Sequence, residues 1–186
     1  DISGPTNTGA VSSSLAAWGD RIAFAASNGS QTRVWSSDGS EAGTAPEMSD
    51  IAPGTNLAVL GLQSAGSGLY AALRYTPSGG STTQDVVTIA APGGVSTIAK
   101  RFGDASSWMS VRGSIGGRVI VSSPAGAGFD RHVWSVGAGA NSGEELVPAT
   151  GQTPRNAAVF APTGGTLTLS APDAARGNPG LWSTDG

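Results

Sequence analysis

A short phrase centred on tryptophan occurs twice in the chain, and a weaker copy occurs once. The clear copies are Trp-Ser-Ser-Asp-Gly at 35–39 and Trp-Ser-Thr-Asp-Gly at 182–186, and the weaker copy is Val-Trp-Ser-Val-Gly at 133–137. Trp134 and Trp182 are 48 residues apart, and the first motif tryptophan precedes Trp134 by 99 residues, about twice that distance. A period near 48 residues indicates an internal repeat of the kind that builds propellers, solenoids or arrays.

A second landmark gives the same period independently. A glycine-led alternation of apolar residues occurs four times, and its aligned residues are spaced by 47, 50 and 48 positions: Ile22, Leu69, Val119 and Leu167. The missing fourth tryptophan should fall near residue 87, where 85–89 has the pattern of a strand and Val87 takes the tryptophan's place. The repeats are therefore approximately 10–56, 57–104, 105–153 and 154–186, with 1–9 as the end of a repeat, in a single domain.

Each repeat divides into four short apolar runs separated by clusters of glycine, proline, serine and asparagine. Period-two alternation in these runs is typical of antiparallel strands joined by turns, and no window keeps helical spacing. The sequence therefore predicts an all-β fold with essentially no helix, as a β-propeller or propeller-like array of about four four-stranded repeats. A row of small β-sandwiches is the alternative, but units of this size bury too little apolar surface to be stable alone. The expected first strands are 15–18, 57–60, 108–111 and 157–160.

The segment 34–44, Val-Trp-Ser-Ser-Asp-Gly-Ser-Glu-Ala-Gly-Thr, resembles a bacterial repeat family named for the consensus Glu-Leu-Trp-x-x-Asp-Gly-Thr. Residues 181–186 match the same core, and Asp-Ile with Pro-Gly at 50–54 resembles an element that follows it in the family. The second and third repeats depart from the consensus. The resemblance implies propeller-like repeats of large secreted or surface proteins of bacteria, and hence an extracellular or cell-surface location. It implies no chemistry.

The physical properties of the motif indicate a structural role. An Asp-Gly pair favours tight hairpin turns, because glycine tolerates positive φ at little cost. A tryptophan three residues earlier can bury a large apolar area between blades. The residues expected to be structural for these reasons are Trp35, Asp38, Gly39, Trp134, Trp182, Asp185 and Gly186.

The chain begins with a segment typical of the end of a repeat and stops within a repeat. Joining its two ends would leave about one strand missing from a blade. We favour a four-repeat piece of a longer array or ring. The alternative is a four-bladed ring that closes imperfectly or completes itself with another copy.

Composition limits the partners. The formal charge is −3 and only 12% of residues are charged, whereas binding to nucleic acid needs clustered basic residues. The absence of cysteine excludes disulfides and cysteine metal sites, and no apolar run is long enough for a membrane helix. The expected partners are other copies of the chain or of the repeat and surface glycans, with no nucleic acid and no membrane insertion.

Candidate catalytic residues are few. His132 is the only histidine, and Asp130 would point to the same face of a strand, so the two residues could form a general-base dyad. We favour the simpler interpretation of a strand-edge histidine beside a carboxylate. No cofactor is expected. Calcium is left open by Asp38, Glu41 and Asp185, but no regular Asp-x-Asp spacing supports it, and aspartates in turns are the favoured interpretation.

Two tryptophans, Trp18 and Trp108, lie in expected first strands outside the motif position. The favoured interpretation places both in the core between blades, but an exposed tryptophan can stack on a sugar. Trp18 is the better candidate for such a contact, because it abuts the charged turn 19–21.

These observations predict a non-enzymatic extracellular structural or adhesive repeat protein, a scaffold for a surface, a fibre or protein–protein contact. One alternative is a lectin-like carbohydrate-binding propeller, and another is the non-catalytic part of a larger enzyme or sensor. A multivalent lectin should repeat its polar ligands, and the residues near the third strands do not repeat: Arg33, Val86, His132 and Gly180.

Overall fold

The described part of the chain folds entirely as antiparallel sheets in a computed structural model. The described residues are 10–27, 32–48, 55–103, 108–124, 131–146, 158–159, 165–172 and 179–185. Within these ranges there is no helix, and hence none that could span a membrane. Fifteen strands form three four-stranded sheets and one three-stranded sheet, which confirms the expected all-β, propeller-like architecture.

Each sheet contains strands that are consecutive in the chain. The first sheet contains β1 (Ala10–Trp18), β2 (Arg21–Ser27), β3 (Thr32–Ser37) and β4 (Ala45–Pro46). The second contains β5 (Thr55–Ala65), β6 (Gly68–Thr76), β7 (Thr83–Ile89) and β8 (Ser96–Gly103). The third contains β9 (Ser110–Ile115), β10 (Arg118–Pro124), β11 (Arg131–Val136) and β12 (Gly143–Glu145). The fourth contains β13 (Ala158–Val159), β14 (Leu167–Pro172) and β15 (Pro179–Thr184).

The pairing register repeats from sheet to sheet. The motif tryptophan position always pairs with the residue two places after the aligned apolar residue of the second strand. These pairs are Trp35 with Phe24, Val87 with Ala71, Trp134 with Val121, and Trp182 with Leu169. Val87 therefore stands in the tryptophan's place, as the sequence predicts.

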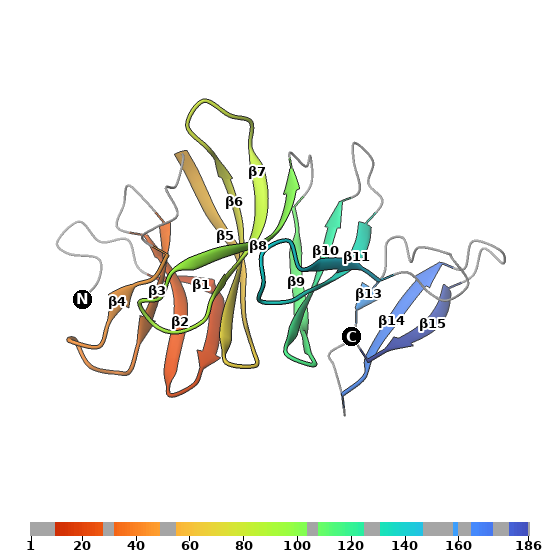
Figure 1. The fold of residues 1–186 in the computed structure, drawn as a ribbon, viewed down its shortest axis with the longest axis horizontal. Helices are drawn as coiled ribbons and strands as arrows, with labels where there is room; N and C mark the ends of the chain where they lie inside the picture. The colour runs from red at the N-terminus through yellow and green to blue at the C-terminus, as the bar shows by residue number, and fades with distance from the viewer. Residues whose placement is uncertain are drawn as a thin grey trace.

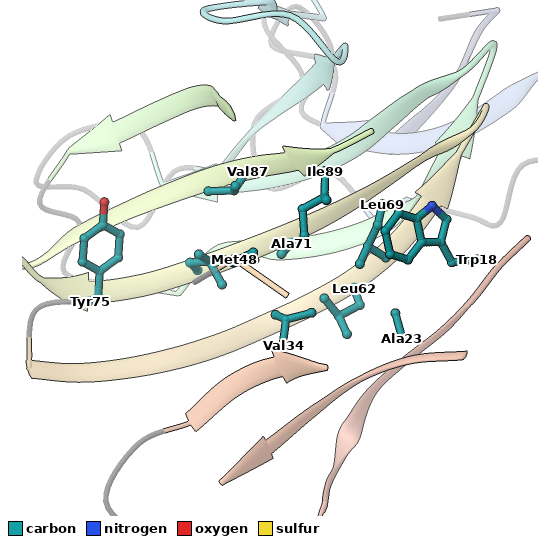
Figure 2. Packing of buried hydrophobic residues seen from close by; sticks show 11 residues of the cluster. Trp18, Ala23, Val34, Met48, Leu62, Leu69, Ala71, Tyr75, Val87 and Ile89 are labelled. Atoms are coloured by element: carbon teal, nitrogen blue, oxygen red, sulfur yellow. The ribbon is translucent and has the colours of Figure 1, made fainter. Parts of the chain in front are cut away.

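The four sheets lie in a row, with the first and fourth at opposite ends (Figure 1). An apolar cluster fills each space between neighbouring sheets. In the first cluster, Trp18 and Val34 from the first sheet face Leu69 and Val87 from the second (Figure 2). Tyr70 points the other way and packs with the third sheet. Because side chains alternate along a strand, the second sheet buries both of its faces.

Hydrogen bonds between neighbouring sheets join residues about one repeat apart. Trp18 Nε1 donates to the Ser67 carbonyl at 2.9 Å across 49 positions. Tyr70 Oη donates to the Gly117 carbonyl at 3.0 Å across 47 positions. These two bonds satisfy the polar ends of large side chains whose rings lie in the core, which buried polar groups require.

The sheets have two different ends. At the first, which we call the turn side, short turns at 66–67 and 116–117 connect the first and second strands of a sheet. At the other, the loop side, the longer connection 77–82 joins β6 to β7. The register places Gln84 opposite Gly103 at that same end, so β8 also finishes on the loop side.

The Asp-Gly pair of the motif does not form the expected tight turn. It opens a loop of residues 38–44 between β3 and β4. Asp38 Oδ1 accepts hydrogen bonds from the backbone N–H of Ser40 at 2.9 Å and from its hydroxyl at 2.7 Å, and Gly39 adopts a φ of 94°. A side chain at Gly43 would overlap the Asp38 carboxylate. The Asp-Gly and Ala-Gly-Thr parts of the motif therefore pack on one another within a single loop.

An arginine at the start of the second strand makes the same contacts in the first and third sheets. Arg21 Nε donates to Ser36 Oγ at 2.9 Å, and Arg118 Nε donates to Ser135 Oγ at 2.7 Å. Both guanidinium groups also donate to a carbonyl in the loop before the fourth strand. The serine directly follows the motif tryptophan in both sheets, so this arginine–serine pair is a further part of the repeat.

Candidate functional site

Trp108 lies at the loop side, two residues before the start of β9, and 53% of its surface is exposed. The expected strand 108–111 therefore starts two residues too early and also ends too early, because β9 runs from Ser110 to Ile115. The expectation that Trp108 lies in the core is also wrong. The other four tryptophans are buried or half-buried, so exposure of an indole is particular to this position.

Arg74 from β6 holds its guanidinium over the Trp108 ring. The guanidinium carbon is 5.1 Å from the ring centroid, within the range of a cation–π interaction. Within the described ranges Arg74 forms no ion pair with a carboxylate. A positive charge that no carboxylate of the described residues neutralises therefore lies beside an exposed aromatic ring.

The backbone next to Trp108 is anchored to the second sheet. The side chain of Gln84, which is fully buried in β7, accepts a hydrogen bond from the Met109 N–H at 2.6 Å. Met109 itself is 2% exposed and packs in the second apolar cluster. One side chain of this short segment is thus fixed in the core, while its neighbour faces solvent.

A polar cluster around Asp85 lies on the opposite face of the second sheet. Arg101 donates to both Asp85 oxygens, at 3.0 Å from Nε and 2.9 Å from a terminal nitrogen, and Tyr75 Oη donates to Oδ2 at 2.7 Å. The Asp85 side chain is fully buried, and that of Arg101 is 54% exposed. Burial, and then the hydrogen bond to Asp85, raise the pKa of Tyr75. The hydrogen bonds and charge of Asp85 raise the pKa of Arg101.

This arrangement gives Asp85 a structural role. Both of its oxygens accept hydrogen bonds inside the protein, so neither is directed at a substrate. The cluster could not be predicted from the sequence, because the pairing of Asp85 with Arg101 follows an irregular step in the ladder between β7 and β8.

His132 contacts a different carboxylate from the one expected. Its Nδ1 lies against Glu145 Oε1 on the neighbouring strand, and the histidine side chain is 19% exposed. Asp130 lies outside the described residues. Glu145 pairs in register with Trp134, two residues beyond His132, so the contact is a diagonal one across the two strands. The cross-strand register was the signal that could have identified it.

The repeat position of His132 also needs correction. It lies two residues before the motif tryptophan, so its counterpart in the second sheet is Asp85, not Val86. The four residues at this position are Arg33, Asp85, His132 and Gly180. Three of the four are of ionisable residue types, and two of those contact a residue on the fourth strand of their sheet: Asp85 with Arg101, and His132 with Glu145.

Trp18, the preferred sequence candidate for a sugar contact, is 4% exposed. The expectation that it reaches solvent is wrong, and the core interpretation is confirmed. Trp134 is half-buried, with the Lys100 ammonium 4.3 Å from its ring centroid. Asp185 is exposed, and Gly186 lies outside the described residues.

The described residues bring no three acidic or histidine side chains together as a metal cluster would require. Asp38 is engaged in its own loop, where hydrogen bonds from Ser40 and then the charge of Arg21 hold the pKa of its carboxyl below the usual value. The side chains expected to surround calcium are therefore not gathered by the described part of the fold.

No family model and no curated protein matches the chain. Similarity to the Glu-Leu-Trp-x-x-Asp-Gly-Thr repeat family thus stays a prediction. Among solved structures, the chain is similar to Zg3597, a family 117 glycoside hydrolase of the marine bacterium Zobellia galactanivorans. The identity is 11% and the TM-score 0.47, over 93% of this chain and 65% of that one, so the chain spans just under two thirds of the enzyme's length.

Two further solved structures are similar at about the same level. One is a GH43_1 enzyme from Xanthomonas citri, at 10% identity and a TM-score of 0.44, over 93% of this chain and 70% of that one. The other is a thermostable family-43 glycoside hydrolase, at 9% identity and a TM-score of 0.42, over 95% and 71%.

The three structures named here are all glycoside hydrolases, which contradicts the expectation of a non-enzymatic structural or adhesive protein. At 9–11% identity the likeness concerns the fold and assigns no substrate or catalytic residue to this chain.

Proposed function

We propose that this chain is a carbohydrate-binding β-propeller whose ligand site is the exposed Trp108 ring bordered by Arg74. The observation that carries the proposal is an indole 53% exposed on a segment that the neighbouring Met109 anchors in the core. An aromatic ring offers an apolar surface for the C–H face of a sugar. The adjacent guanidinium offers fixed N–H donors for hydroxyl or carboxylate oxygens.

Anchoring makes this ring a better binding platform than a freely moving surface tryptophan. The hydrogen bond from Met109 to Gln84 fixes the backbone, and Arg74 lies over the ring. Less conformational freedom is then lost when a ligand binds, and this favours affinity. Because Arg74 has no carboxylate partner within the described ranges, acidic sugars should bind more tightly than neutral ones.

Cleavage of the bound glycan would require two carboxyl groups flanking the glycosidic bond. The two buried carboxylates of the described part are engaged elsewhere: Asp85 by Arg101 and Tyr75, and Glu47 by Ser36 at 2.7 Å and the Gly93 N–H at 2.8 Å. Five of the thirteen acidic residues lie outside the described ranges: Asp1, Asp50, Asp104, Asp130 and Asp173. The test of the proposal therefore includes a direct assay for hydrolysis of the same glycans.

The test is a glycan array followed by calorimetric titration of the glycans that bind. Trp108→Ala should weaken binding at least about tenfold, the loss typical of a central contact residue. Arg74→Ala should weaken binding of acidic glycans more than that of neutral ones. Val95→Ala is the matched control, because Val95 is also an exposed apolar residue, at 79%, but lies in the turn between β7 and β8.

Product analysis on the bound glycans shows whether they are also cleaved. A flat array, or full binding by Trp108→Ala, would overturn the proposed site. An extracellular or cell-surface location is part of the proposal, since it would bring the site to exposed glycans, and secretion of the full-length protein in its native cells tests it.

A further inference from the structure

One repeat position is buried in three sheets and open in the first. The aligned apolar residue of the second strand faces the preceding sheet, where Leu69, Val119 and Leu167 are all 0% exposed. Its counterpart in the first sheet, Ile22, is 50% exposed. No described sheet covers this face, which we call the leading face.

Leu15 enlarges the leading face. It pairs in register with Phe24, two residues from Ile22, so all three side chains lie on the same side of the first sheet. Leu15 is 68% exposed, whereas Leu62, its counterpart in the second sheet, is 7% exposed and packs in the first apolar cluster. Two large aliphatic side chains are thus exposed in the first sheet at positions where the second sheet buries its counterparts, Leu62 and Leu69.

The fourth sheet has a corresponding exposed residue on its other face. The residue just before the motif tryptophan faces the following sheet, and Val34, Val86 and Val133 are 0–1% exposed there. Its counterpart Leu181 is 77% exposed. This second open face, which we call the trailing face, lies at the other end of the row of sheets (Figure 1).

We infer that the trailing face of one copy of this chain packs on the leading face of a second copy. The partner follows from the chain itself, because its three internal boundaries each join a trailing-type face to a leading-type face. The junction between copies would continue that established interface with the same repeat positions. Such a head-to-tail contact is heterologous, so it closes into a ring or extends into a filament according to the rotation that it imposes.

Replacing one apolar residue on each face by a charged one tests the inference. Ile22→Glu and Leu181→Glu replace exposed side chains, so both variants should fold. Sedimentation over a concentration range should show the wild type associating above 18.3 kDa. Each variant should raise the dissociation constant at least about tenfold, since it places a charge in the centre of the junction. Val95→Glu, also exposed but on neither face, should leave association unchanged.

Mixing the two variants gives the decisive result. The Ile22→Glu copy keeps its trailing face and the Leu181→Glu copy keeps its leading face, so the mixture should form a one-to-one dimer that grows no further. A wild type that stays monomeric at all concentrations would overturn the inference. So would a mixture that stays monomeric, or an equal loss of association in Val95→Glu. This test is independent of whether glycans bind.

Discussion

The second sheet departs from the repeat motif, yet it is better buried than the first sheet, which keeps the motif. All seven residues of β7 are buried, although valine replaces the tryptophan there. In β3, which carries Trp35, only two of six positions are buried. The difference shows that burial in this fold depends on having a sheet on each side. The motif serves another purpose, the packing of the loop between the third and fourth strands.

The largest expected effect compares one repeat position in the two sheets. Leu69→Ala should destabilise the protein by about 2–5 kcal/mol, because it leaves a cavity between two sheets. Ile22→Ala, at the same position of the first sheet, should cost less than about 1 kcal/mol, since half of Ile22 is already exposed. Urea unfolding of dilute protein measures both free energies. Equal losses would mean that neighbour contacts do not set the difference.

A smaller effect is expected at Asp85, the buried carboxylate that occupies the repeat position of His132 in the second sheet. Asp85→Ala should cost about 2–3 kcal/mol, because it leaves the Tyr75 hydroxyl buried without its acceptor and removes the partner of Arg101. Part of the ion pair is exposed to solvent, so we expect less than for a fully buried pair. Thermal unfolding compares this variant with Tyr75→Phe, which should cost about 1 kcal/mol. A loss for Asp85→Ala no larger than for Tyr75→Phe would contradict the role of the ion pair.

The smallest effect concerns the motif loop of the first sheet and depends on pH. The pKa of Asp38 is lowered in the folded protein, so its contribution to stability is present above the ordinary aspartate pKa of about 4. That contribution is lost as the pH falls through the folded pKa. Asp38→Asn should therefore be less stable than the wild type at about pH 7 and similar to it at about pH 2. A pH-independent difference in melting temperature would assign the effect to the loop's shape instead.

Much of the fold followed from the sequence because it is specified locally. Alternation and glycine turns determine the strands, and one repeat period determines the register, which is why Val87 could be matched to tryptophan positions. The candidate site could not be predicted from the sequence, because the exposure of a side chain depends on what packs against it in the fold. Trp18 ends the first strand of its sheet and is 4% exposed, whereas Trp108 precedes the first strand of its sheet and is 53% exposed.

The polar contacts were missed for a related reason. Asp85 with Arg101 and His132 with Glu145 are pairs between a third and a fourth strand. Each pair depends on the register between the third and fourth strands, which the sequence alone does not determine. In the second sheet an irregular step shifts that register. The proposed glycan site was missed because it consists of one exposed ring and one nearby cation, and no local motif marks such a pair.

The proposed glycan site on the loop side is tested most directly by amide hydrogen exchange with and without the glycan that binds most tightly. The ligand should slow exchange in peptides that contain Met109 and β9, next to Trp108, and in none that contain the turn-side loop 38–44. Trp108→Ala should abolish this protection. Unchanged exchange around Met109, with protection in 38–44 instead, would contradict the assignment of the binding site to the loop side.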